Sequence, residues 1–228
     1  MAIIPQLRVL LGASLMLLAC LPAWAKQGEL KPFILAAKAS GDMATTVAET
    51  KQKLVAAGFE VVGEYAPYAN ASIVIVTNDA LKSNAAASEM GADGAGQRVS
   101  VTKVDDKSQV AVTNPVYMSH AYRMKGDLAA VRGQLAKALG DQGEYGPEEG
   151  QTPEQLREYH YKFLMPYFDD QKRLAIHKDH ASALAAVEAG LATGKSGARQ
   201  VSRIGGPGKP EAGSGVSPAA TDTPNPAA

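Results

Sequence analysis

The chain has 228 residues, of which 46% are hydrophobic and 20% are charged. This is an ordinary globular composition, with enough apolar residues for one core of moderate size or two small ones. The 23 basic residues balance the 23 acidic residues, and aromatic residues make up only 6% of the chain. A neutral chain has no bulk electrostatic attraction to nucleic acid or acidic lipid, and few aromatic residues argue against base stacking. We therefore expect no nucleic-acid partner.

Residues 1–25 have the pattern of a secretory signal peptide. Arg8 makes the start positive, residues 9–21 are apolar but too short to span a bilayer, and an Ala-Trp-Ala cleavage site follows. We expect cleavage before Lys26 and a periplasmic or secreted mature protein with no integral membrane segment. The only cysteine, Cys20, lies in a sequence close to a lipobox, so a lipid anchor at this residue is the alternative.

The pattern over residues 32–65 predicts a strand, a helix and a second strand. Residues 33–37 are an apolar run that predicts the first strand. Thr46-Val-Ala-Glu49 has the form of a capping box at the start of a helix, and Gly58 stands where a left-handed residue can end one. Residues 59–65 predict the second strand.

The next part of the chain predicts a central strand, a helix and a hairpin. Residues 71–77 are a continuous apolar run, which is typical of a strand buried on both faces. Asn78-Asp79 offers two residues that can cap a helix over residues 80–90. Apolar and polar residues alternate in 98–104 and 109–113, on either side of a tight turn, which predicts a β-hairpin.

Two helices are predicted after the hairpin. Asn114-Pro115 combines a cap residue with proline at the first helical position, and this helix is expected to reach about Met124. Asp127 can cap the second helix, whose apolar residues over 128–139 share one face, and Gly140 ends it.

The segment Thr46–Tyr65, TVAETKQKLVAAGFEVVGEY, resembles the N-terminal signature of the domain of unknown function 302 family. The hairpin, the Asn114-Pro115 step and the helix that ends before Gly140 follow in that family's order. The resemblance covers Lys31–Gly140, about half of the chain. It implies a compact α/β domain that often pairs as a homodimer, and it implies no established activity.

The C-terminal part predicts a smaller unit. Residues 141–152 are a linker rich in glycine and glutamate, and Thr152-Pro-Glu-Gln155 is a second capping box, for a helix expected to carry Phe163 and Leu164. A strand, a helix and a strand are then predicted at residues 173–177, 181–191 and 200–204. This unit would repeat the opening one as a divergent half-copy, or match it by chance.

Together these patterns predict an α+β fold: a two-layer mixed sheet with helices packed on one face, plus a C-terminal βαβ extension. Residues 205–228 consist largely of glycine, proline, alanine and serine, so we expect a disordered tail. The expected units are the signal peptide, the family-like domain, the linker, the extension and the tail, at residues 1–25, 26–140, 141–152, 153–204 and 205–228.

Methionine and histidine residues suggest two metal sites, for copper or zinc. Met118, His120 and Met124 would share a helix face, and thioether and imidazole groups together suit copper. The alternative is the buried stripe of an amphipathic helix. His177 and His180 are close enough in sequence to converge on one ion, and the alternative is a polar turn with Asp179 as a helix cap.

An aromatic cluster suggests a ligand pocket. Tyr159, His160, Phe163 and Tyr167 lie close together in a chain that is otherwise poor in aromatic residues. The alternative is that they attach the linking helix to the sheet.

The sequence favours a non-enzymatic secreted module that binds a small ligand or a protein partner, as a homodimer and without a cofactor. It has no Gly-x-Ser-x-Gly motif, and its mature form would have no thiol. The two alternatives are a periplasmic metal-binding protein and a hydrolase or isomerase with His160 or His180 as general base.

Overall fold

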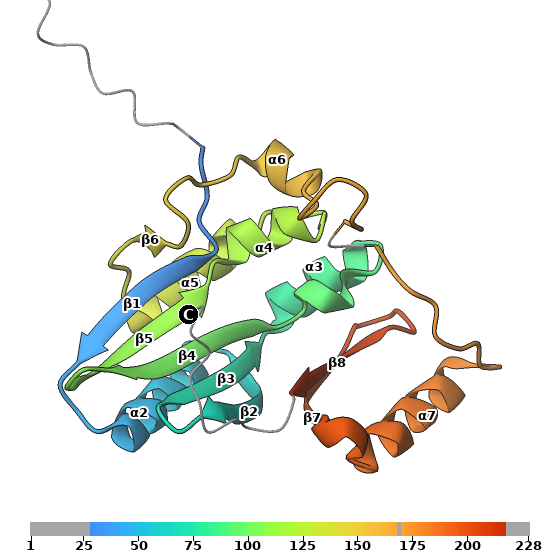
Figure 1. The fold of residues 1–228 in the computed structure, drawn as a ribbon, viewed down its shortest axis with the longest axis horizontal. Coiled ribbons are helices and arrows are strands. Elements are labelled where there is room, and N and C mark those ends of the chain that lie inside the picture. The colour runs from blue at the N-terminus through green and yellow to red at the C-terminus, as the bar shows by residue number, and fades with distance from the viewer. Residues whose placement is uncertain (1–27, 168–169, 218–228) are drawn as a thin grey trace, which may run out of the picture.

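The computed structural model describes residues 28–167 and 170–217. It confirms the α+β fold: a six-stranded sheet with helices, and a separate C-terminal hairpin (Figure 1). The expected signal peptide and the lipid attachment at Cys20 lie outside the described residues.

The main sheet has the strand order β2-β3-β4-β5-β1-β6. Its strands are β1 (Phe33–Ala39), β2 (Glu60–Tyr68), β3 (Ala71–Thr77), β4 (Gln97–Val104), β5 (Lys107–Thr113) and β6 (Glu144–Tyr145). The helices are α2 (Met43–Ala56), α3 (Asp79–Ala87), α4 (Pro115–Ala121), α5 (Ala129–Leu139), α6 (Pro153–Arg157) and α7 (His180–Ala192). Two 3-10 turns are η1 (Gly91–Gly94) and η2 (Lys195–Gly197), and the C-terminal hairpin consists of β7 (Arg199–Gly205) and β8 (Ala212–Ser217).

The sheet is antiparallel in every pairing that the structure describes, so the expectation of a mixed sheet was wrong. The opening strand, helix and strand form as predicted, but β1 pairs with β5 and β6 while β2 pairs with β3. Three other strands, β3, β4 and β5, therefore separate the two strands that α2 joins. The segment expected to be a linker also contributes, because β6 is the edge strand beside β1.

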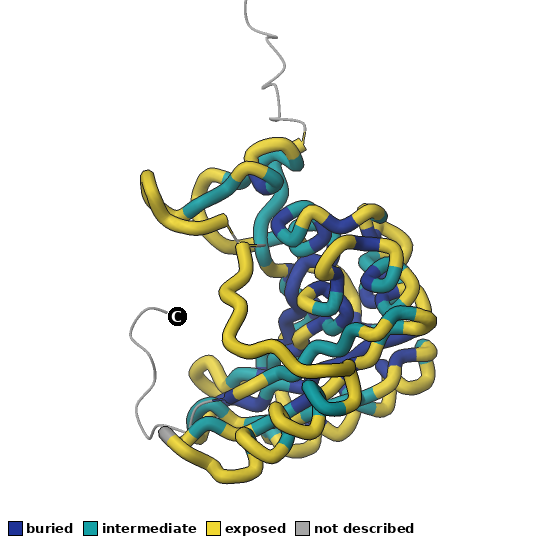
Figure 2. The backbone as a smooth tube through the Cα atoms, turned by 90° about the vertical axis from the view of Figure 1, so that its right-hand side faces the viewer, coloured by how far each residue is buried: buried dark blue, intermediate teal, exposed yellow. Residues whose placement is uncertain are grey.

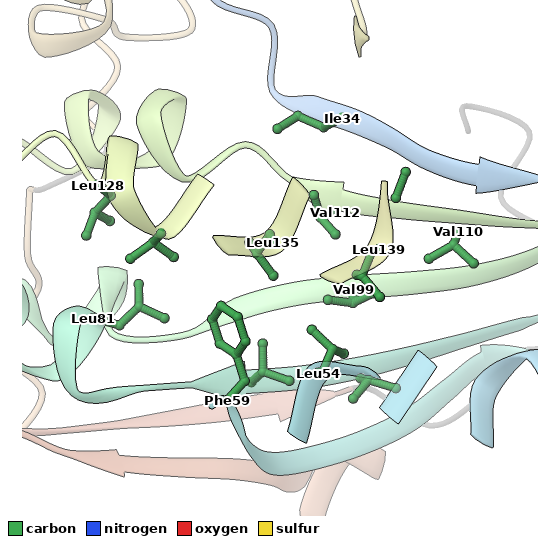
Figure 3. Close-up of a cluster of buried hydrophobic side chains, with 14 of the residues drawn as sticks. Ile34, Leu54, Phe59, Leu81, Val99, Val110, Val112, Leu128, Leu135 and Leu139 are labelled. Carbon is green, nitrogen blue, oxygen red and sulfur yellow. The ribbon is translucent and has the colours of Figure 1, made fainter. Parts of the chain in front are cut away.

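One face of the sheet packs against α2 and α5 to form the core. Val99, Val110 and Val112 point from the central strands toward Leu54 of α2 and Leu135 of α5 (Figure 3). All five side chains are buried, and so are most residues of β3, which confirms the apolar face predicted for α5 and the buried central strand. Burying a side chain of this size stabilises the fold by about 1.5–3 kcal/mol.

Local hydrogen bonds place the helix starts. Asp42 caps α2 by accepting from the backbone N–H of Thr45 at 3.0 Å, so the helix begins three residues before the capping box expected at Thr46. Asn78 and Asn114 cap α3 and α4 as predicted. The capping box at Thr152 is also present, as predicted.

Three helices end earlier than the sequence predicted. α3 ends at Ala87, although the helix was expected to reach residue 90. α4 ends at Ala121, because Arg123 takes a left-handed conformation with φ of 50°. α6 ends at Arg157, so Phe163 and Leu164 lie outside it, and each is 86% exposed.

The C-terminal part is a helix and a hairpin instead of a βαβ unit. Residues 173–177 form no strand, and β7 pairs with β8, which arises from the segment expected to be a disordered tail. The internal repeat is therefore not present in this form. Residues 218–228 lie outside the described residues.

The hairpin lies against the second face of the sheet, where β7 closely approaches β2. Gly63 permits this approach, because a Cβ atom there would lie 1.9 Å from the carbonyl oxygen of Val201. The side chain of Ile204 on β7 is 8% exposed and extends the hydrophobic core. The sheet is thus covered by helices on one face and partly by the hairpin on the other.

Burial is uneven along the chain. Figure 2 shows buried residues concentrated in the main sheet and its helices, while residues 161–167 and 170–178 between α6 and α7 are exposed. α7 fits its predicted position, but none of its residues is buried. Over the described ranges, no helix combines the length and hydropathy needed to cross a membrane.

We predict that Gly63→Ala loosens the hairpin from the sheet, because the backbone of β2 or β7 must shift to admit the Cβ atom. Hydrogen exchange of the β7 and β8 amides should become faster. Gly133→Ala is the matched control, because Gly133 lies inside α5 and nothing is within 4 Å of an added Cβ. This control should raise the free energy of unfolding by about 0.5–1 kcal/mol. Unchanged exchange in the Gly63 variant would contradict the close packing.

Candidate ligand cavity

A cavity of about 240 Å³ lies between the main sheet and the C-terminal hairpin. The four strands β2 to β5, the turn η1, the residues around α4 and both strands of the hairpin contribute to its walls. The volume corresponds to about eight water molecules at ~30 Å³ each. It lies just below the range of roughly 300–1,000 Å³ typical of drug-sized ligands, so the cavity suits a smaller molecule.

The sheet wall follows from the register of the strands. Gly63 pairs with Ile75, and Ile75 pairs with Arg98, so these residues share one face. Their sequence neighbours Val74 and Val99 point to the opposite face and into the core, because side chains alternate along a strand. The hydroxyl of Thr113 accepts from the backbone N–H of Arg98 at 3.2 Å and fixes the wall at this point.

Polar contacts fix the hairpin wall beside η1. The carboxylate of Glu211 accepts from the backbone N–H of Ala92 at 2.9 Å. Lys209 forms an ion pair with Glu211 at 3.2 Å and donates to the backbone carbonyl of Ser88 at 2.5 Å. These contacts join the turn of the hairpin to the segment that follows α3, so the cavity is bounded on both sides by anchored backbone.

Small residues leave the space open. Gly213 and Gly215 on β8 both line the cavity. A Cβ atom would lie 3.0 Å from the carbonyl oxygen of Ala92 at the first position and 2.3 Å from the hydroxyl oxygen of Ser202 at the second. Glycine therefore lets β8 lie close to its neighbours at these two positions.

Among the described residues that line the cavity, Arg98 is the only basic one. It is exposed, and within the described ranges its guanidinium group makes no ion pair or hydrogen bond. Asp93 of η1 is the only acidic residue of the lining in the part of the chain that the structure describes. Burial together with nearby Glu211 raises the pKa of its carboxyl group above 3.8. The cavity therefore holds one cation and one carboxylate.

The phenol of Tyr122 is close enough to both charges for each to affect its pKa. Burial raises the pKa of its phenol above 10, the charge of Asp93 raises it further, and Arg98 opposes the shift. The phenol is therefore neutral at pH 7 and offers an O–H donor. Tyr65 contributes a second phenol from β2. Together these groups can orient an anion beside an apolar wall made by Ile75 and Ile204.

A second hollow, of about 420 Å³, shares Tyr122 with the first. Its other lining residues, among them Glu89, Arg123 and Asp170, are all exposed. It has no hydrophobic wall of buried residues, so the 240 Å³ cavity is the better candidate.

The structure brings together only part of the predicted aromatic cluster. His160 and Tyr167 stack edge to face with ring centroids 5.1 Å apart, and the guanidinium of Arg123 lies 4.9 Å from the centroid of Tyr167. Tyr159 is half-buried and lies near Tyr117, whereas Phe163 points into solvent. None of the four predicted residues lines the 240 Å³ cavity, and their role as ligand contacts stays a prediction.

The predicted methionine and histidine ligands point to different places. Met118 lines the cavity, Met124 is fully buried in the core, and His120 accepts from the side chain of Arg157 at 3.2 Å through Nδ1. Burial and the charge of Arg157 lower the pKa of His120. Because α4 ends before Met124, His120 and Met124 do not share a helix face as expected.

The second predicted metal site lies at the start of α7. His177 and His180 are both exposed, and Asp179 caps the helix by accepting from the N–H of Ser182 at 2.7 Å. The part of the chain that the structure describes contains no group of three or more His, Cys, Asp or Glu residues placed to hold a metal ion. Copper or zinc binding stays a prediction.

Four residues of the cavity were not predicted as site residues from the sequence: Arg98, Asp93, Tyr65 and Tyr122. Arg98 was assigned to a hairpin strand, which is correct. The available signal was Arg98 itself, a cation in a strand where valine alternates with polar residues. This signal alone could not identify a site, because nothing in the sequence indicated that residues 212–217 would pack over this face of the sheet.

Comparison of the chain with protein-family models, with curated proteins and with solved structures found no match. The resemblance to the domain of unknown function 302 family therefore stays a prediction.

Proposed function

We propose that the mature protein is an exported, non-enzymatic module that binds a small organic carboxylate in the 240 Å³ cavity. The observation that carries this proposal is the guanidinium of Arg98, which lies at the cavity wall without a partner among the described residues. Export is supported by the signal-peptide pattern of residues 1–25.

A carboxylate matches this guanidinium in both charge and shape. The planar fork of arginine matches the two oxygens of a carboxylate and can form two parallel, charge-assisted hydrogen bonds. Tyr122 supplies a neutral phenol that can donate to the same anion, since its pKa is raised. Ile75 and Ile204 offer contacts to the apolar body of the ligand.

The charge of the cavity favours a monoanion over phosphate. A single arginine faces the cavity, and the carboxylate of Asp93 lines it as well. A dianionic phosphate would be repelled by Asp93 more strongly than a carboxylate would, and one arginine offers limited compensation. The limited volume also favours a ligand of roughly drug-fragment size.

The cavity is formed within one chain, so the proposal requires no second copy. The expected homodimer stays a separate prediction.

We predict that small carboxylates bind to the chain that begins at Lys26, and that Arg98→Gln weakens this binding at least tenfold. Hydrogen bonds to charged groups contribute about 1.5–3 kcal/mol, which sets this size. NMR titration with acetate, butyrate, benzoate and succinate measures the affinity, with neutral benzamide and inorganic phosphate as ligand controls.

Arg199→Gln is the matched protein control, because Arg199 is exposed at the start of β7 and does not line the cavity. It should leave the affinity unchanged. Three results would contradict the proposal: no carboxylate binds at millimolar concentration, Arg98→Gln binds as the unaltered chain does, or phosphate binds more tightly than every carboxylate.

We predict that Asp93→Asn tightens carboxylate binding at pH 7 by roughly threefold or more, because it removes a like charge from the cavity. The variant should also fold at least as stably. Since the pKa of Asp93 is raised in the folded state, its ionised form lowers the free energy of unfolding above that pKa, and asparagine removes this effect. The same titration and a urea unfolding curve measure both quantities. Weaker binding by a well-folded variant would instead indicate a ligand whose cationic group pairs with Asp93.

A further inference from the structure

The connection between α6 and α7 exposes large apolar side chains. We define the exposed connection as residues 161–167 and 170–178, which contain no helix or strand. Figure 1 shows it in orange along the outside of the molecule, and in Figure 2 it is coloured as exposed. The exposed fraction is 86% for Phe163 and for Leu164, 94% for Leu174 and 80% for Ile176.

This amount of exposed apolar surface differs from the scattered exposure that is normal on a protein. Phe163 and Leu164 lie next to each other in a turn, where Leu164 has a left-handed backbone with φ of 67°. The neighbouring Tyr161 is 72% exposed and Met165 is 50% exposed. Contiguous exposed apolar residues commonly mark a surface that binds a partner or a membrane.

Basic residues accompany the apolar ones. Lys162 lies beside Tyr161, with its ammonium group 5.6 Å from the ring centroid, while Lys172 and Arg173 precede Leu174. The exposed connection has four basic residues, counting Lys178, against Asp170 alone. Asp169, outside the described residues, adds a second acid, so the local net charge is +2 although that of the whole chain is zero.

The exposed apolar and basic residues together match an interfacial membrane-binding segment. Aromatic and aliphatic side chains can enter the boundary between headgroups and acyl chains, while lysine and arginine remain at the level of anionic headgroups. This composition fits a protein-binding surface less well, because lysine is depleted in protein interfaces.

We propose that the exposed connection binds the surface of an anionic lipid bilayer, with Phe163 and Leu164 inserted at the headgroup boundary. Leu174 and Ile176 form the second apolar contact, and the flanking lysine and arginine residues face the anionic headgroups. This binding is independent of the cavity, because no residue of the exposed connection lines it.

Sedimentation with lipid vesicles tests the proposal on the chain that begins at Lys26, which avoids binding by the apolar signal segment. One set of vesicles contains phosphatidylglycerol and phosphatidylcholine, and the other contains phosphatidylcholine alone. We expect stronger binding to the anionic vesicles, which decreases as salt is added. Phe163→Ser combined with Leu164→Ser should weaken this binding at least tenfold, and Lys172→Gln with Arg173→Gln should reduce the preference for anionic vesicles.

The matched control is Val55→Ser combined with Val104→Ser, because these valines are 57% and 46% exposed on α2 and β4. It should leave vesicle binding unchanged. The proposal is overturned if the chain does not sediment with anionic vesicles, or if the control weakens binding as much as the Phe163 and Leu164 variant does. It is also overturned if analytical ultracentrifugation, without lipid, shows a dimer that this variant dissociates, since a second copy would then cover the residues.

Discussion

The close approach of β7 to β2 at Gly63 is the constraint on which the candidate site depends. Only a residue without a Cβ atom allows the carbonyl of Val201 to come this near to the sheet. The approach lets Ile204 join the core and keeps the hairpin over the face that carries Arg98. The contacts of Glu211 and Lys209 then secure the far end of the hairpin. Without this docking the exposed guanidinium of Arg98 would lose the hairpin wall of the cavity, including Ile204.

Much of the main sheet could be predicted from the sequence, because its signals are local. The cap at Asn114, the hairpin between β4 and β5 and the apolar face of α5 each depend on residues within a few positions of one another. The start of α2 was placed too late, since Asp42 competes with Thr46 as the cap and lies closer to the preceding strand. The antiparallel strand order was missed, because it depends on pairings between distant segments.

The candidate cavity could not be predicted from the sequence for the same reason. β8 consists of small residues that also suit a disordered tail, and its order arises from pairing with β7. Residues 173–177 gave the opposite error: their apolar residues predicted a strand, but they pair with no strand within the described ranges. The two errors share one cause, which is that strand formation requires a neighbour that local patterns do not specify.

Binding of a carboxylate in the cavity is the proposed centre of function, and a crystal structure of the chain from Lys26 grown with benzoate tests it most directly. It should show the carboxylate within hydrogen-bond distance of the guanidinium of Arg98, and the ring against Ile75 and Ile204. Benzoate bound away from the hairpin, or a hairpin that leaves the second face of the sheet uncovered, would contradict the account.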